Sequence, residues 1–167
     1  MKKIYNTYIL LVSIVLLVST TANAQISKVE IRATGLTCSM CSNAINKQFK
    51  KLAEVDSVAT DLNTNTFVVY LKKDNKLSPN VFKESVEKAG FFVGSFEVTM
   101  PLEQLKSNSN YILIEANEAK SNNDVVVRIF DKGYVTEKEY KKLLKSYSKT
   151  ATYALNNEAD YHIKIIN

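Results

Sequence analysis

Residues 28–41 read KVEIRATGLTCSMC, an alternating segment followed by a loop that carries both cysteines of the chain. Within residues 28–34, Val29, Ile31 and Ala33 fall on one face, and charged residues alternate with them. Because successive side chains of a strand point to opposite faces, this alternation predicts a half-buried strand. The cysteine loop therefore follows directly on a strand.

The segments after the loop predict a helix and then a hairpin. Apolar residues recur at helical spacing over residues 39–53, and lysines fall on the other side of that helix. Residues 55–62 and 66–71 predict two strands, the second rich in β-branched and aromatic residues. The asparagine-rich residues 63–65 predict the turn that joins them.

A second helix is predicted from Ser78 and Pro79 to Gly90. Serine can cap free backbone N–H groups, proline suits the first helical position, and glycine adopts the left-handed conformation that ends many helices. Residues 92–99 then predict another strand. The order over residues 26–100 is that of a ferredoxin-like βαββαβ sandwich, of the α+β class.

The polar segment 101–110 is interpreted as a linker or as a short frayed helix followed by a loop. Residues 111–167 after it predict a second, smaller α+β unit. Thr136 and Glu139 form a capping box for a helix that runs to about residue 147. Strand patterns lie at residues 111–115, 125–130 and 161–166. The sequence indicates no function for this unit.

The loop GLTCSMC, residues 35–41, has the composition of a soft-metal site. Gly35 permits a sharp turn, and Thr37 can hydrogen-bond the loop or cap the helix. Cys38 and Cys41 are three residues apart at the helix start, where backbone N–H groups favour thiolates. Thiolate prefers Cu(I), Hg(II) or Ag(I), whereas a structural Zn(II) site typically has four ligands.

With this loop at a strand-to-helix junction, the chain resembles the heavy-metal-associated domain of copper chaperones, of copper-transporting P-type ATPases and of the periplasmic mercury-binding protein. The family loop is usually GMTCxxC, so Gly35, Thr37, Cys38 and Cys41 match it. Leu36 replaces the family methionine. Phe91 stands where that family places a lysine or an aromatic residue close to the metal loop.

The resemblance implies metal binding and delivery without catalytic turnover. We expect one Cu(I) between Cys38 and Cys41, exchanged with a membrane metal transporter or a secreted cuproenzyme. Hg(II), Ag(I) and Zn(II) stay open as the ion. A thiol–disulfide role, with Cys38 attacking and Cys41 resolving, is an alternative, as is a scaffold whose C-terminal unit binds the partner. Dimerisation through a shared metal also stays open.

Residues 1–24 predict a secretory signal peptide. Lysines precede a short apolar run, and Ala22 and Ala24 form an A-x-A cleavage site before Gln25. Cleavage would place the mature protein in the periplasm or outside the cell. The formal charge of +5 becomes +3 when Lys2 and Lys3 leave, and no arginine-rich stripe is present, so we expect no nucleic-acid partner.

We expect no metal-binding role for the other soft or charged side chains considered. Met40 is expected to face solvent, and Met100 and His162 are expected at ordinary surface or edge-strand positions because neither has a companion ligand at a suitable spacing. Four lysines of the last helix are expected to form a solvated face; they are Lys138, Lys141, Lys142 and Lys145.

Overall fold

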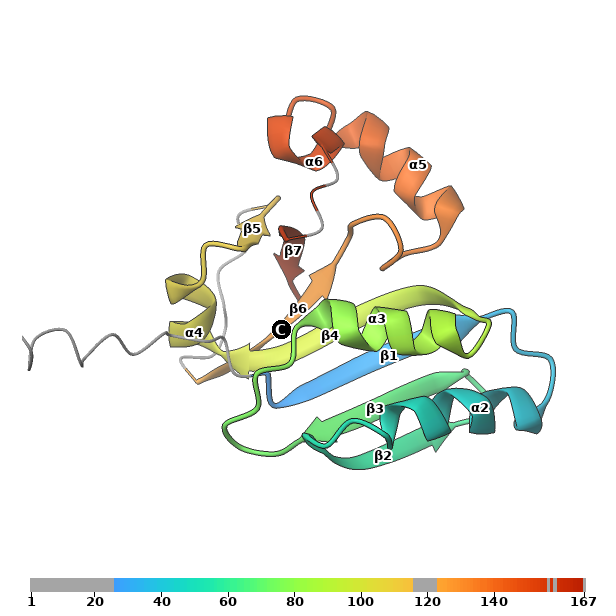
Figure 1. The fold of residues 1–167 in the computed structure, drawn as a ribbon. Helices are drawn as coiled ribbons and strands as arrows, with labels where there is room; N and C mark the ends of the chain where they lie inside the picture. The colour runs from blue at the N-terminus through green and yellow to red at the C-terminus, as the bar shows by residue number, and fades with distance from the viewer. Residues whose placement is uncertain (1–25, 116–122, 156, 158, 167) are drawn as a thin grey trace, which may run out of the picture.

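The computed structural model describes residues 26–115, 123–155, 157 and 159–166, so the signal peptide predicted at 1–24 lies outside the described residues. The strands of this part of the chain form one sheet of seven, in the order β2-β3-β1-β4-β6-β7-β5 (Figure 1). The first elements are β1 (Lys28–Thr34), α2 (Ser39–Phe49), β2 (Val55–Asp61), β3 (Thr66–Leu71), α3 (Pro79–Lys88) and β4 (Phe92–Pro101). The remaining elements are α4 (Leu102–Ser107), β5 (Tyr111–Leu113), β6 (Asp124–Ile129), α5 (Glu137–Ser146), α6 (Ala151–Leu155) and β7 (Tyr161–Ile165).

The first six elements confirm the ferredoxin-like prediction. β1 is central and pairs antiparallel with β3 on one side and β4 on the other, and β2 pairs with β3. Figure 1 shows α2 and α3 lying side by side over one face of these strands. Phe49 of α2 and Phe82 of α3 are fully buried between helices and sheet, with ring centroids 6.2 Å apart.

The predicted helix ends are confirmed in some places and differ in others. Gly90 has a φ of +89° and follows the C-terminus of α3, as expected of a glycine that ends a helix. Ser78 stands at the N-cap of α3 but makes no side-chain capping hydrogen bond, so that part of the prediction is wrong. Helix α2 ends at Phe49, so the prediction of a helix to residue 53 is wrong: residues 50–53 form turns and a bend.

The C-terminal residues extend the same sheet. β6 pairs antiparallel with the end of β4, β7 pairs with β6, and the short β5 pairs parallel with β7. The segment 101–110 contains α4, and its Leu105 is buried in the common core. The two predicted units therefore share one sheet, and residues 101–110 connect two parts of it rather than two separated domains.

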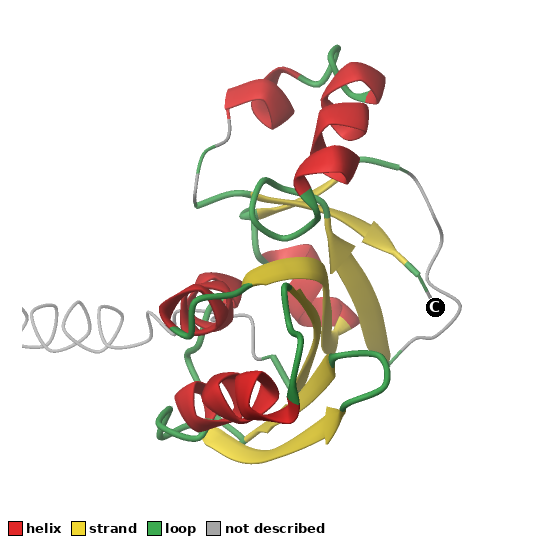
Figure 2. Ribbon diagram, turned by 90° about the vertical axis from the view of Figure 1, so that its right-hand side faces the viewer, coloured by secondary structure: helices red, strands yellow, loops and turns green. Residues whose placement is uncertain are grey.

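Helices α5 and α6 cover the C-terminal end of the sheet, beyond the layer of α2 and α3 (Figure 2). Beneath them lies a small second cluster that includes Phe130, Tyr140 and Tyr153. The side-chain oxygen of Thr136 accepts from the N–H of Glu139 at the start of α5, which confirms one half of the predicted capping box. The other half is wrong, because the Glu139 carboxylate accepts from Arg128 instead. The four lysines predicted to face solvent are exposed. No helix in the described ranges is long and apolar enough to cross a membrane.

The predictions for Met100 and His162 are wrong. Met100 is fully buried, because β6 pairs along the end of β4 and places Val125 opposite it. His162 is also fully buried, since β7 lies between β6 and β5 and is not an edge strand. Its Nδ1 lies 2.7 Å from Oδ1 of Asp131, and its backbone N–H donates to Oδ2 of the same carboxylate.

Candidate metal centre

The cysteine loop joins the end of β1 to the start of α2. Gly35 has a φ of +87°, a conformation that L side chains rarely adopt, so the residue after the strand has to be able to turn in this way. The loop then runs into α2, where Cys38 occupies the N-cap position with extended backbone angles. Cys41 lies on the first turn of the helix. The strand and the helix thus fix both ends of a short loop.

The two sulfurs lie close together at the molecular surface. The Sγ atoms of Cys38 and Cys41 are 2.9 Å apart, and both residues are free thiols. Cys38 is exposed and Cys41 is partly exposed. Because a disulfide bond is about 2.05 Å long, the pair is not bonded, but it is near enough for both sulfurs to reach one ion.

The surroundings of Cys41 favour its thiolate. A hydrogen bond from the Cys38 side chain, followed by one from the Thr37 backbone, holds the pKa of the Cys41 thiol below its ordinary value. Smaller contributions come from the Cys38 backbone and the Thr37 hydroxyl. The first turn of α2 carries no acidic residue, so no carboxylate in that turn opposes the favourable end of the helix dipole. Metal binding needs a thiolate, so these contacts lower the cost of binding.

Leu36 and Phe91 support the loop from below. Both are partly buried and pack against the main core. A Cβ added to Gly35 would lie 3.8 Å from Cδ1 of Phe91, so the aromatic ring is in contact distance of the turn. The ring of Phe91 therefore lies beside the turn at Gly35, and Leu36 packs its apolar side chain against the core.

A bulge in β4 exposes a second phenylalanine that the sequence reasoning missed. Arg32 pairs with Ser95 and Ala33 pairs with Val93, so Gly94 is an extra residue. A Cβ on Gly94 would come within 2.6 Å of Thr34 Cγ2, which explains the glycine. The extra residue shifts the alternation of β4 by one position, so Phe92 points outward and is 70% exposed.

No third ligand joins the cysteines in the part of the chain that the structure describes. No group of three or more His, Cys, Asp or Glu residues that could hold a metal ion occurs there. Met40 is 80% exposed, as predicted. His162 and Met100 are buried elsewhere, Met100 near the opposite end of β4 from the cysteine loop. The donor set is therefore a pair of thiols, which fits a soft ion of low coordination number.

Comparison with known proteins agrees with this site. The family described as heavy-metal-associated domain matches residues 30–92. A yeast copper transporter domain is 35% identical, with 39% of this chain and 88% of that chain covered and a TM-score of 0.36. The N-terminal domain of a potential copper-translocating P-type ATPase from Bacillus subtilis is 28% identical, with coverages of 40% and 82% and a TM-score of 0.36.

A copper binding domain from another P-type ATPase is 27% identical, with 44% of this chain and 93% of that chain covered and a TM-score of 0.38. No curated protein matches the chain. The family match contains the cysteine loop and spans the elements from β1 to the start of β4. Residues 30–92 of this chain therefore belong to the heavy-metal-associated domain family.

Proposed function

We propose that this protein is an exported metallochaperone or scavenger that holds one Cu(I) ion between Cys38 and Cys41 and passes it on by ligand exchange. The observation that carries the proposal is the pair of thiols 2.9 Å apart on an exposed loop, at the start of a helix. Similar domains are parts of copper transporters. In this proposed role the protein has no catalytic turnover of its own.

The donor set favours Cu(I) over Zn(II). Thiolates are soft ligands, and Cu(I) can be held by two of them, whereas structural Zn(II) is almost always bound by four ligands. The only histidine of the chain is buried against Asp131 and is not available as a ligand. Hg(II) and Ag(I) share the softness of Cu(I) and are the alternative ions, of which Hg(II) is compared with Cu(I) in a titration.

Exposure of the site suits transfer. Cys38 is open to solvent, so a thiol or thioether of a partner can approach a bound ion before either protein ligand leaves. Cys41 is anchored on α2 and its thiolate is stabilised by its neighbours, so it can hold the ion while Cys38 is exchanged. A membrane metal transporter or a secreted cuproenzyme is the proposed partner.

Export to the periplasm or the exterior is part of the proposal and rests on residues 1–24. In an oxidising compartment the cysteines can form a disulfide, which would block metal binding until it is reduced. The proposed function therefore requires the reduced form. The state of the two thiols in the exported protein can be measured by alkylation before and after reduction.

A competition titration tests metal binding. The reduced mature protein is titrated with Cu(I), Zn(II) and Hg(II) against a chelating indicator, beside the double variant Cys38→Ser, Cys41→Ser. We expect one equivalent of Cu(I) to bind tightly to the native protein and not to the variant. Equal binding by both proteins would show that the cysteine loop is not the metal site.

The close thiols also support a second candidate, a thiol–disulfide protein. Cys38, the exposed thiol, would attack one sulfur of a substrate disulfide, which forms a mixed disulfide and releases the other substrate sulfur as a thiol. Cys41 would then attack the Sγ of Cys38 and release the second substrate thiol. The products are a Cys38–Cys41 disulfide and the reduced substrate, so electrons and protons balance. Reduction of a model disulfide that persists in the presence of a copper chelator would favour this candidate.

A further inference from the structure

The outer edge of β4 is only half paired. On one side, β4 pairs with β1 from Phe92 to Thr99. On the other side, β6 pairs with β4 only from Glu97 to Pro101. No described strand therefore pairs with the outer edge of residues 92–96, which is about 13 Å long at the usual rise of a strand. This open edge begins one residue after Phe91, which supports the metal loop.

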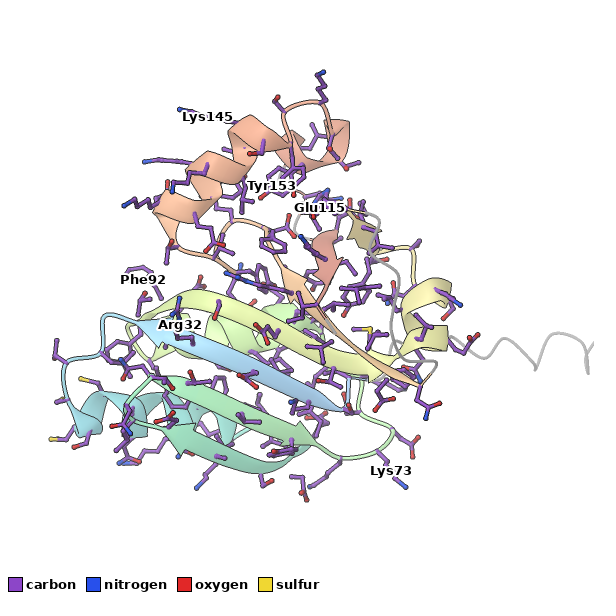
Figure 3. All side chains as sticks on the ribbon, turned by 180° about the vertical axis from the view of Figure 1, so that it is seen from behind. Arg32, Lys73, Phe92, Glu115, Lys145 and Tyr153 are labelled. Atoms are coloured by element: carbon purple, nitrogen blue, oxygen red, sulfur yellow. The ribbon has the colours of Figure 1, made fainter. Side chains whose placement is uncertain are left out.

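A groove of about 410 Å³ lies between the start of β4 and the segment that leads into α5. Thr34, Phe92 and Val93 line it on the side of the metal loop, and Val135 and Thr136 line it on the side of α5. Figure 3 shows Phe92 at the end of the sheet, between the sheet and α5. Phe92 is 70% exposed, so an apolar ring is available at this groove.

The groove is lined by the apolar Phe92, Val93 and Val135 and also by the charged residues Glu87, Lys132 and Glu137. An open strand edge beside this groove favours an extended peptide as its occupant. The edge offers main-chain N–H and C=O groups that a further strand can pair with, and such pairing is a common mode of peptide recognition. The alternating side chains of the added strand would face the groove at every second position. The segment before α5 stands across the groove, so a single extended segment fits there better than a second folded domain.

We propose that the edge of β4 at residues 92–96, together with this groove, binds an extended segment of the protein with which the metal is exchanged. The nature of the partner rests on the proposed function, whereas the peptide site rests on the strand pairing and the groove. Binding there places the partner beside Gly35, at the base of the loop that carries both thiols. The C-terminal residues thus supply one wall of a docking site next to the metal loop.

Two synthetic peptides provide the test. One is an end-blocked heptapeptide of alternating valine and threonine, and the other has proline in place of its central valine, which prevents pairing along a sheet edge. Each is added to the reduced, isotope-labelled mature protein, and amide exchange is followed by NMR. We expect the first peptide to slow exchange at those amides of residues 92–96 that point away from β1, on both sides of the Gly94 bulge.

A matched pair of variants locates the site. Phe92→Glu removes an exposed apolar wall of the groove, and Leu62→Glu changes an equally apolar residue, 55% exposed, in the β2–β3 turn. We expect Phe92→Glu to weaken peptide binding about tenfold, a loss of 1.4 kcal/mol. Leu62→Glu should bind as the native protein does. Native-like amide spectra of both variants exclude misfolding.

Three outcomes would overturn the proposal: no protection of residues 92–96, equal protection by the proline peptide, or undiminished binding to Phe92→Glu. Because the peptide is added to metal-free protein, these results do not depend on whether Cys38 and Cys41 bind Cu(I). If the copper titration fails but the peptide still protects residues 92–96, the peptide site stands, and its partner is not a protein that exchanges metal with this one.

Discussion

Tyr134, in the segment between β6 and α5, packs edge-to-face on Phe96 of β4, with ring centroids 5.0 Å apart. Tyr134 is 4% exposed, and Lys83 of α3 lies over its ring at 5.6 Å from the centroid. One aromatic side chain of the C-terminal part therefore contacts both the sheet and a helix of the metal-binding part. Through this contact the two parts share one hydrophobic core.

We predict that Tyr134→Ala destabilises both parts together, by about 3 kcal/mol, the usual cost of removing a large buried aromatic side chain. Tyr134→Phe keeps the ring and should cost much less. Hydrogen exchange with mass spectrometry reports on α2 and on β7 separately. Equal loss of protection in both is expected, and loss confined to β7 would show that the parts unfold independently.

The buried pair of Asp131 and His162 predicts a second effect on stability. The carboxylate accepts from the backbone N–H of His162 at 2.6 Å and lies 2.7 Å from its ring nitrogen. Asp131→Ala leaves two buried donors without an acceptor, and each such group costs about 1–3 kcal/mol. Asp131→Asn keeps one acceptor oxygen and should lose about half as much. Urea unfolding measures both, and equal losses would contradict this account.

Gly35 and Gly90 form a matched pair for the metal loop. Both have positive φ angles, +87° and +89°. A Cβ on Gly35 would lie at an ordinary contact distance of 3.8 Å from Phe91, and a Cβ on Gly90 would meet nothing within 4 Å. Gly35→Ala and Gly90→Ala should therefore destabilise the fold alike, by about 1–2 kcal/mol each. Only Gly35→Ala should also weaken Cu(I) binding, because Gly35 starts the loop. A parallel loss of Cu(I) affinity in Gly90→Ala would contradict this role.

Much of the fold could be predicted from the sequence, because its signals are local. Alternation, helical spacing, the Gly90 stop and the Thr136 cap each depend on residues close together in the chain. The pairing of β4 with β6 could not be predicted, since nothing local to Met100 shows that a strand 25 residues later lies beside it. The burial of His162 likewise depends on the pairing of β7 with β5 and β6, both of which lie far from it in the sequence.

The candidate site shows the same limit. Cys38 and Cys41 are close in sequence, and their spacing alone brings the sulfurs together. The sequence predicts only that Phe92 begins a strand. Its exposure depends on the Gly94 bulge, which exists only when β1 pairs with β4. A glycine in the middle of a strand was the available signal, because such glycines often mark bulges.

Glu97 and Glu30 lie directly opposite each other on β4 and β1, which predicts a pH dependence of stability. Burial, and then the charge of Glu30, raises the pKa of Glu97. A raised pKa of an acid in the folded state means that stability is lost as the pH rises through that pKa. Glu97→Gln should therefore stabilise the protein at neutral pH, by about 0.5 kcal/mol as for opposed like charges. The difference should vanish well below the ordinary pKa of a glutamate.

Glu84 gives the control of opposite sign. A hydrogen bond from Lys88, and then its charge, lowers the pKa of Glu84, so ionised Glu84 favours the folded state. Glu84→Gln should destabilise the protein at neutral pH and converge with the native protein in acid. Thermal unfolding of both variants across this pH range checks the signs. If both variants shift stability in the same direction, the opposed glutamates are not the cause.

The hydrogen bond between the two cysteines predicts how each thiol reacts. The Cys38 side chain is the largest cause that lowers the pKa of Cys41. In Cys38→Ala this donor is lost, so the pKa of Cys41 should rise toward that of a free thiol. In Cys38→Ser a hydroxyl donor remains, so the pKa should stay lower. The rate at which iodoacetamide alkylates Cys41 as a function of pH measures both values, because only the thiolate reacts.

Thr37→Val removes a smaller contribution, so the pKa of Cys41 in this variant should fall between its values in the native protein and in Cys38→Ala. Coincident pH profiles for the alanine and serine variants would mean that the loop backbone, rather than Cys38, sets the pKa of the Cys41 thiol.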